Sequence, residues 1–299
     1  MPERTAAGSS IAGVLASAVE RLAHSGMADP RREATGLWAA LTGEGVKPGD
    51  VWRERDREAA PEVARRFWEA VERRASGVPF AYAVGRVGFR TLELRVDPRA
   101  LIPRPETEGL VERVLREAGK RESGGGRGGV VADIGTGCGC IALSLAVEGG
   151  FDGVIAVECS AGAAALAREN GALVRPPVPV EVREGDLLAP LAGQRYRAIV
   201  SNPPYLTEAE YADLDPAVRR FEPRDALVSG VDGLDATRAL LAGARPLLAP
   251  GGILALEIDE RRADAVRGLA CRHGWSRVAV YDDLFGRPRF LLAGLEEGA

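Results

Sequence analysis

The segment Asp133–Gly139, with the sequence DIGTGCG, follows a short apolar run and leads into an Ala- and Leu-rich stretch. Glycines in the first strand-to-helix turn of an open α/β sheet let the backbone approach a nucleotide closely. Glu158 ends the next apolar run, where an acid can accept hydrogen bonds from ribose hydroxyls. The pair fits a nicotinamide enzyme about as well as an S-adenosylmethionine enzyme, and a merely tight turn is a third reading. Ala142 stands where the dinucleotide fingerprint expects a third glycine. This favours the S-adenosylmethionine reading only mildly.

A second candidate, Ser201–Tyr205 with the sequence SNPPY, directly follows the apolar run 198–200. Consecutive prolines end a strand's hydrogen-bond ladder, so we expect the carbonyls of Asn202 and Pro203 to point into the cleft above the sheet. Pro203 and Pro204 carry no amide proton, Asn202 adds a side-chain oxygen, and Tyr205 adds an aromatic face. This set suits a planar amino group, which needs two acceptors and can stack. The alternative is a proline-stiffened turn without chemistry.

Other chemistries lack the residues that they need. The histidines are His24 and His273, which fall in different predicted domains, so a serine or cysteine triad has no base. A zinc site at Cys138 and Cys140 would place thiolates inside the glycine turn, and we expect no metal. Cys138 is expected beside a ligand instead, and Cys140 under the following helix.

Several motifs resemble those of known methyltransferases. Similarity to the class I S-adenosylmethionine-dependent enzymes that modify exocyclic or amide nitrogens is found at Asp133–Gly139, Glu158, Asp186 and Asn202–Tyr205. Residues 101–108 (LIPRPETE), 221–223 (FEP) and 230–234 (GVDGL) resemble, more narrowly, the HemK/PrmC-type release factor glutamine methyltransferases. The resemblance covers roughly residues 77–292. The NPPY motif alone is shared by DNA adenine and RNA guanine methyltransferases, whereas RPETE is more specific.

The resemblance implies S-adenosylmethionine as cofactor and, as substrate, the glutamine of the Gly-Gly-Gln motif of class 1 peptide-chain release factors. The implied cofactor-binding residues are Asp133, Gly135, Thr136, Gly137, Cys138, Gly139, Glu158, Asp186, Leu187 and Asn202. The substrate amide would be bound by Asn202, Pro203, Pro204 and Tyr205, of which Asn202, Pro203 and Tyr205 would be catalytic. An N-methyltransferase acting on DNA or rRNA is the first alternative, and an NAD-dependent oxidoreductase is a distant second.

The sequence departs from the family pattern at four positions. Glu158 replaces an aspartate, and Leu187 replaces an aromatic residue beside the adenine. Arg197 stands where an acid often precedes the strand, and Asp259 stands where glycine usually follows it. The first two changes lie in the implied cofactor pocket and could lower its affinity. None removes a residue that the chemistry requires.

The spacing of apolar residues predicts the elements that must position these motifs. Helices are predicted at 9–24, 31–42 and 60–75, a β-hairpin between 78 and 105, a helix at 106–119 and a flexible loop at 121–129. Strands are then predicted at 130–134, 153–157, 178–182, 198–201, 253–258, 276–281 and 289–292, and helices at 141–147, 161–170, 234–248 and 263–273. This alternation predicts an α/β, Rossmann-like and mostly parallel sheet with helices on both faces. One of the last two strands should run antiparallel, because no helix separates them.

Three regions are expected. The apolar pattern predicts a helical domain at 1–76 and a β-hairpin connector at 77–105, and the resemblance implies that 1–76 docks the substrate and that 106–299 is the methyltransferase domain. Residues 1–75 contain 12 Arg or Lys and 12 Asp or Glu, so a nonspecific phosphate-binding module is not expected there. A protein partner explains this domain better than nucleic acid does.

Composition sets outer limits on function. The chain has 299 residues, 46% of them hydrophobic, and no apolar run of the roughly 18 to 20 residues that cross a bilayer. The net charge is −4, and only Lys47 and Lys120 accompany the arginines, so stable nucleic-acid binding is not expected. Four cysteines and an N-terminal apolar stretch too short for export predict a reducing, cytoplasmic location. We expect a monomer.

Overall fold

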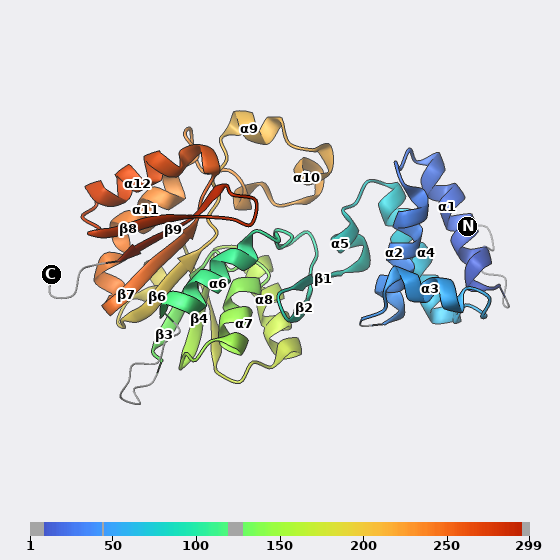
Figure 1. Ribbon diagram of the computed structural model, residues 1–299, viewed down its shortest axis with the longest axis horizontal. Coiled ribbons are helices and arrows are strands. Elements are labelled where there is room, and N and C mark those ends of the chain that lie inside the picture. Colours follow the sequence, from blue (N-terminus) through green and yellow to red (C-terminus); the bar gives the residue numbers. More distant parts are fainter. Residues whose placement is uncertain (1–8, 44, 119–127, 295–299) are drawn as a thin grey trace. The chain divides into compact units, whose positions relative to one another are not determined.

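The computed structural model describes residues 9–43, 45–118 and 128–294. The chain divides into two compact units, Met1–Gly85 and Arg86–Ala299 (Figure 1). The loop predicted at 121–129 lies almost entirely outside the described residues. Among the described helices, none is both long and apolar enough to span a membrane.

The first unit is helical. It contains α1 (Ile11–His24), α2 (Pro30–Thr42), α3 (Pro48–Glu54), α4 (Pro61–Ala75) and α5 (Phe80–Val84). Proline opens α2, α3 and α4, where its missing N–H costs nothing. Leu22, Leu37 and Phe67 are fully buried, and the rings of Trp38 and Phe67 meet edge to face at 5.1 Å. These helices form a core of their own.

Two elements of this unit differ from the prediction. Helix α3 was not expected. Phe80–Val84, which falls within the segment 78–105 predicted as the hairpin, forms the short helix α5 because the amides of Ala83 and Gly85 donate to the carbonyls of Pro79 and Ala81. Gly85 ends this turn in the left-handed region, at φ +81°. The hairpin is therefore shorter than predicted and begins after Gly85.

The second unit opens with that hairpin, formed by β1 (Arg86–Phe89) and β2 (Leu92–Arg95), followed by α6 (Thr107–Ala118). Its sheet contains β3 (Val130–Ile134), β4 (Gly153–Glu158), β5 (Val180–Glu184), β6 (Tyr196–Ser201), β7 (Leu248–Glu257), β8 (Arg277–Asp282) and β9 (Pro288–Gly294). The strand order is β5-β4-β3-β6-β7-β9-β8, and β9 runs antiparallel to both neighbours. This confirms the predicted mostly parallel sheet with one antiparallel strand.

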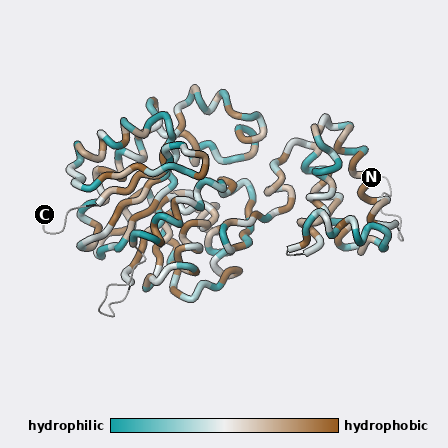
Figure 2. Tube along the Cα trace, in the orientation of Figure 1, coloured by the Kyte–Doolittle hydropathy of each residue, from teal (hydrophilic) through white to brown (hydrophobic). Residues whose placement is uncertain are grey.

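Helices cover both faces of the sheet. α6, α7 (Cys140–Glu148) and α8 (Ala161–Val174) lie on one face, and α11 (Asp235–Gly243) and α12 (Ala263–Arg272) lie on the other (Figure 1). Alternate strand residues such as Ala132, Ile134 and Ile199 join the α11 and α12 side chains in one core. Hydrophobic residues accordingly concentrate along the strands (Figure 2). The sheet is buried on both faces, as a parallel sheet must be.

Several boundaries differ from the predicted ones. β5 begins and ends two residues late, and α8 continues to Val174. The helix predicted at 234–248 ends at Gly243, and Pro246 then sits in a separate 3-10 turn, Arg245–Leu247. Short helices α9 (Glu208–Ala212) and α10 (Pro216–Phe221) follow the SNPPY segment.

Candidate active site

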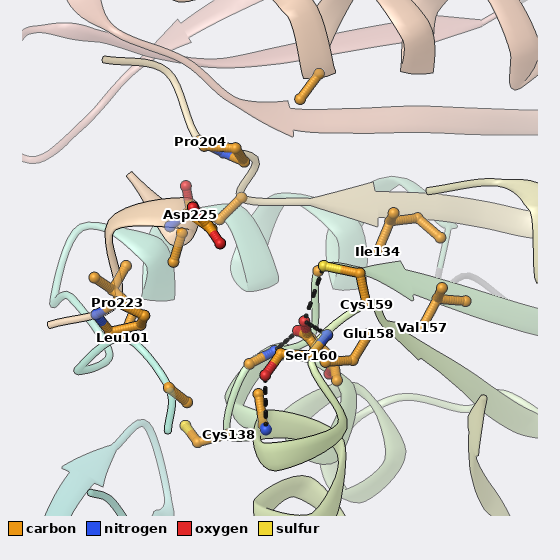
Figure 3. A pocket seen from close by; sticks show the side chains of 18 of the residues that line it. Leu101, Ile134, Cys138, Val157, Glu158, Cys159, Ser160, Pro204, Pro223 and Asp225 are labelled. Atoms are coloured by element: carbon orange, nitrogen blue, oxygen red, sulfur yellow. Dashed lines mark hydrogen bonds between the residues drawn. The ribbon is translucent and has the colours of Figure 1, made fainter. Parts of the chain in front are cut away.

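A cavity of about 770 Å³ opens at the carboxyl ends of β3, β4 and β6. In an open α/β sheet this edge is where ligands bind. The predicted residues that line the cavity are Gly135, Thr136, Gly137, Cys138, Glu158, Asp186, Leu187, Asn202 and Pro204. Leu101, from the segment 101–108, and Pro223, from the segment 221–223, line the side of the cavity across from Glu158 (Figure 3). The structure therefore brings most of the predicted site into one cavity.

The glycine turn separates into two parts. Gly135 and Gly137 have φ of +70° and +57° and line the cavity. A Cβ on Gly135 would meet no atom within 4 Å, so its backbone is open to a ligand. Gly139, at φ +88°, does not line the cavity, and a Cβ there would lie 3.3 Å from Leu143 Cδ1. Gly139 is a packing position rather than a contact surface.

Asp133 is fully buried and does not line the cavity. Its Oδ2 accepts hydrogen bonds from Thr136 Oγ1 at 2.6 Å and from the Ala142 amide at 3.1 Å. Its Oδ1 is buried with no hydrogen-bond partner among the described residues. Burial raises the pKa of Asp133 to about 7, and the Glu158 charge adds to this effect. Asp133 therefore ties the turn to the start of α7.

Glu158 lies on the cavity wall at the end of β4 (Figure 3). Its two oxygens accept from the Gly137 amide at 2.8 Å and from the Ser160 amide at 2.9 Å. The Gly135 and Thr136 amides both donate to the Val157 carbonyl just before it. Glu158 thus shapes the glycine turn as well as facing the cavity.

Asp186 and Leu187 line the same cavity after β5. Leu187 is in the left-handed region at φ +44°, which is unusual and strained for a branched side chain. The Gly185 amide donates to the Glu158 carbonyl at 3.0 Å and holds this turn beside β4.

The SNPPY segment is only partly in the cavity. Asn202 and Pro204 line it, whereas Pro203 and Tyr205 are not among its lining residues. Burial, followed by the nearby Glu257 charge, raises the pKa of Tyr205 to about 12. The stacking role of Tyr205 and the acceptor role of the Pro203 carbonyl stay predictions.

Asn202 is held by residues that the sequence did not single out for a role. Its Nδ2 donates to Thr107 Oγ1 at 3.1 Å, and Thr107 Oγ1 donates to Glu257 Oε2 at 2.7 Å. Thr107 belongs to the RPETE motif, which signalled the family without indicating this contact. Glu257 ends β7, the strand beside β6, and this adjacency is the signal that could have found it.

The segments 101–108 and 221–223 are joined by hydrogen bonds to Glu222. Glu222, whose side chain is 1% exposed, accepts from Arg104 at 2.7 Å and from the Ile102 amide at 3.2 Å. Asn170 on α8 donates to the carbonyls of Cys138 and Arg95 and so joins the glycine turn to β2. The cavity wall is thereby fixed by buried polar side chains. Within the described ranges, no group of residues has the composition and closeness of a metal site.

Comparison with known proteins gives the family. Residues 13–85 match the PrmC N-terminal domain, and residues 112–220 match the methyltransferase small domain. A release factor glutamine methyltransferase of Moorella thermoacetica is 44% identical over 93% of this chain and 96% of that protein. The chain belongs to the release factor glutamine methyltransferase family. A relative of the same name in Deinococcus radiodurans is 39% identical over 94% of this chain and 96% of that protein.

Solved structures give the fold. A methyltransferase from Pyrococcus furiosus aligns with a TM-score of 0.50 at 20% identity, over 68% of this chain and 88% of that one. The hMettl16 catalytic domain, solved with MAT2A 3′UTR hairpin 6, aligns with a TM-score of 0.55 at 17% identity, over 79% and 82%. This release factor glutamine methyltransferase family member has the class I methyltransferase fold. Membership of a methyltransferase family excludes the oxidoreductase alternative.

Proposed function

We propose that this chain methylates the side-chain amide nitrogen, N5, of the glutamine in the Gly-Gly-Gln motif of class 1 peptide-chain release factors, using S-adenosylmethionine. The names of the relatives support a release factor as the substrate. One structural observation carries the chemistry: Asn202 lines the cavity, and its Nδ2 is engaged by Thr107, so its Oδ1 remains an acceptor. Because release factors act in translation, we propose a cytoplasmic location.

The cavity residues fit the proposed cofactor. The volume of about 770 Å³ lies within the roughly 300–1,000 Å³ of small-molecule sites. Gly135 and Gly137 give an open backbone surface, and Glu158 presents a carboxylate at the ribose position. Asp186 and Leu187 form the part of the wall that would receive the adenine. When bound, S-adenosylmethionine supplies a methyl group that its sulfonium already activates.

The chain itself would contribute alignment rather than a strong base. An amide nitrogen is a weak nucleophile because its lone pair is delocalised into the carbonyl. Acceptors at Asn202 Oδ1 and the Pro203 carbonyl would hold the two amide protons, which aims the nitrogen and enriches its electron density. Orientation of this kind can supply about 7–11 kcal/mol of barrier reduction.

The direct test offers tritium-labelled S-adenosylmethionine together with release factor, DNA or rRNA. We expect label on the release factor alone, and none when the glutamine of its Gly-Gly-Gln motif is replaced by alanine. Label on nucleic acid but not on the release factor would instead establish the nucleic-acid alternative.

Asn202→Ala tests the alignment mechanism. Loss of a positioned polar group lowers turnover by roughly 10²–10³-fold. Cofactor affinity, measured by calorimetry, should change far less than kcat. Asn202→Asp keeps the size and an acceptor oxygen, but it adds a charge and loses the Nδ2 donor to Thr107, so it tests whether the neutral amide is needed. Near-normal turnover in Asn202→Ala would rule the mechanism out.

A further inference from the structure

We propose that Thr107 and Glu257 are positioning residues that hold the Asn202 amide in one orientation, with its oxygen toward the cavity. The inference deepens the proposed function and rests on it, because the orientation matters only if the substrate presents N–H donors. Glu257 does not line the cavity, whereas Thr107 reaches its wall, where its hydroxyl is taken up by Glu257 and Asn202. Both act through Asn202.

The three side chains form a short chain of hydrogen bonds drawn from distant parts of the sequence. Thr107 begins α6, Glu257 ends β7, and Asn202 follows β6. Asn202 Nδ2 lies 3.1 Å from Thr107 Oγ1, which lies 2.7 Å from Glu257 Oε2. Thr107 is 2% exposed and Glu257 is 1% exposed. Water therefore has little access to replace these bonds.

Proton counting fixes the direction of the chain. A threonine hydroxyl has one proton to donate, and an ionised carboxylate can only accept. When Glu257 is ionised, the Thr107 proton must go to Glu257, which leaves only lone pairs facing Asn202. Asn202 must then present its Nδ2 to Thr107, and its Oδ1 is left for the substrate.

A neutral donor at position 257 removes this constraint. A protonated Glu257, or a glutamine in its place, can donate to Thr107 Oγ1. The Thr107 proton is then free to donate to Asn202 Oδ1, which favours a flipped amide. The flipped Asn202 would present N–H groups to a substrate that also presents N–H groups.

The surroundings of Glu257 set when it ionises. Burial raises its pKa to about 7, and Glu106 adds to the rise, whereas the Thr107 hydrogen bond, Arg289 on β9 and Arg104 oppose it. Tyr205 also responds to Glu257, whose charge contributes to the raised pKa of the Tyr205 hydroxyl. The competent orientation should therefore dominate above about pH 7.

The sequence offers a test that does not depend on catalysis. Asn170, Gln194 and Asn202 are its three side-chain amides, so their ¹⁵N–¹H signals can be assigned by substitution. In the full-length protein, the Asn202 signal should titrate with a midpoint near 7. Glu257→Gln should abolish the titration. An Asn202 signal that keeps its wild-type titration in Glu257→Gln would overturn the inference.

Kinetics supply the second arm. We expect Glu257→Gln to lower kcat about 10²-fold, with little change in the dissociation constant for S-adenosylmethionine and without the acid limb of the wild-type pH profile. Thr107→Val should lose activity, and Thr107→Ser should restore both rate and acid limb because it keeps the hydroxyl. Thr237→Val, at a buried threonine of α11 outside the cavity lining, should behave as wild type.

The outcomes separate the two proposals. If Thr107→Val and Thr107→Ser have equal kcat, or Glu257→Gln retains the wild-type profile, the positioning role is wrong while the function stands. If the wild-type chain shows the Asn202 titration but does not label a release factor, the proposed function is wrong and the hydrogen-bond chain remains.

Discussion

Glu158 holds the glycine turn and also faces the proposed ribose site. It accepts from the Gly137 and Ser160 amides, and it faces the cavity where the ribose would lie. Glu158→Gln keeps one acceptor oxygen but loses the charge. A hydrogen bond to a charged group contributes about 1.5–3 kcal/mol, so we expect the dissociation constant of S-adenosylmethionine to rise about 10- to 150-fold. Calorimetry measures it, and unchanged affinity would contradict the ribose assignment.

Residue types near a glycine turn or a proline pair can be recognised in the sequence, and Gly135, Glu158 and Asn202 were. Thr107 and Glu257 were not assigned a role, because Thr107 lies 95 residues from Asn202 and 150 residues from Glu257 in the sequence. Their pairing depends on which strands are neighbours. The sequence also could not show that Gly139 packs against a helix, since positive φ is needed in either case.

At the scale of the element, the glycine turn supplies a matched pair of substitutions. Gly135→Ala and Gly139→Ala both force alanine into the left-handed region, which costs about 1–2 kcal/mol. The new Cβ at 135 would enter the cavity, and the one at 139 would press on Leu143. We expect both to lower the melting temperature, but only Gly135→Ala to raise the dissociation constant of S-adenosylmethionine. Equal cofactor affinities would contradict this division of the turn.

The β3–α7 junction should make stability depend on pH. The pKa of Asp133 is about 7 in the folded chain against an ordinary 3.8, so the native state holds a proton that the unfolded state loses. Stability from this group is complete below about pH 4 and falls as pH rises towards 7. Asp133→Asn should abolish this loss, which amounts to on the order of a few kcal/mol of unfolding free energy between about pH 4 and 7, measured by urea unfolding. Asp264→Asn, at a side chain 97% exposed, is the control and should retain the slope.

Most elements of the sheet were predictable because most strands are short apolar runs between turn residues. The failures are local. Residues 83–84 look like a strand in isolation, but Pro79 before them and Gly85 after them close a single helical turn. β5 contains exposed and half-buried residues rather than a wholly apolar run, so its bounds were predicted two residues too early. In both places neighbouring contacts outweigh the local pattern.

For the whole molecule, the helical unit is predicted to dock the protein substrate. The structure ends this unit at Gly85 rather than at residue 76, so deletion of residues 1–85 is the cleaner experiment. Losing contacts remote from the reacting atoms should raise KM for the release factor while the cofactor dissociation constant stays the same. Circular dichroism must first show that the remaining unit is folded. Unchanged kcat/KM would assign the docking surface elsewhere.

The position of β9 determines when the sheet can be completed while the chain is being synthesised. β9 follows β8 in sequence but lies between β7 and β8 in the sheet. A ribosome releases β7 long before β9, so one edge of β7 has no native partner until Gly294 has emerged. An unpaired apolar edge invites aggregation. We therefore expect a chain that stops after β8 to aggregate rather than to fold as a weakened enzyme.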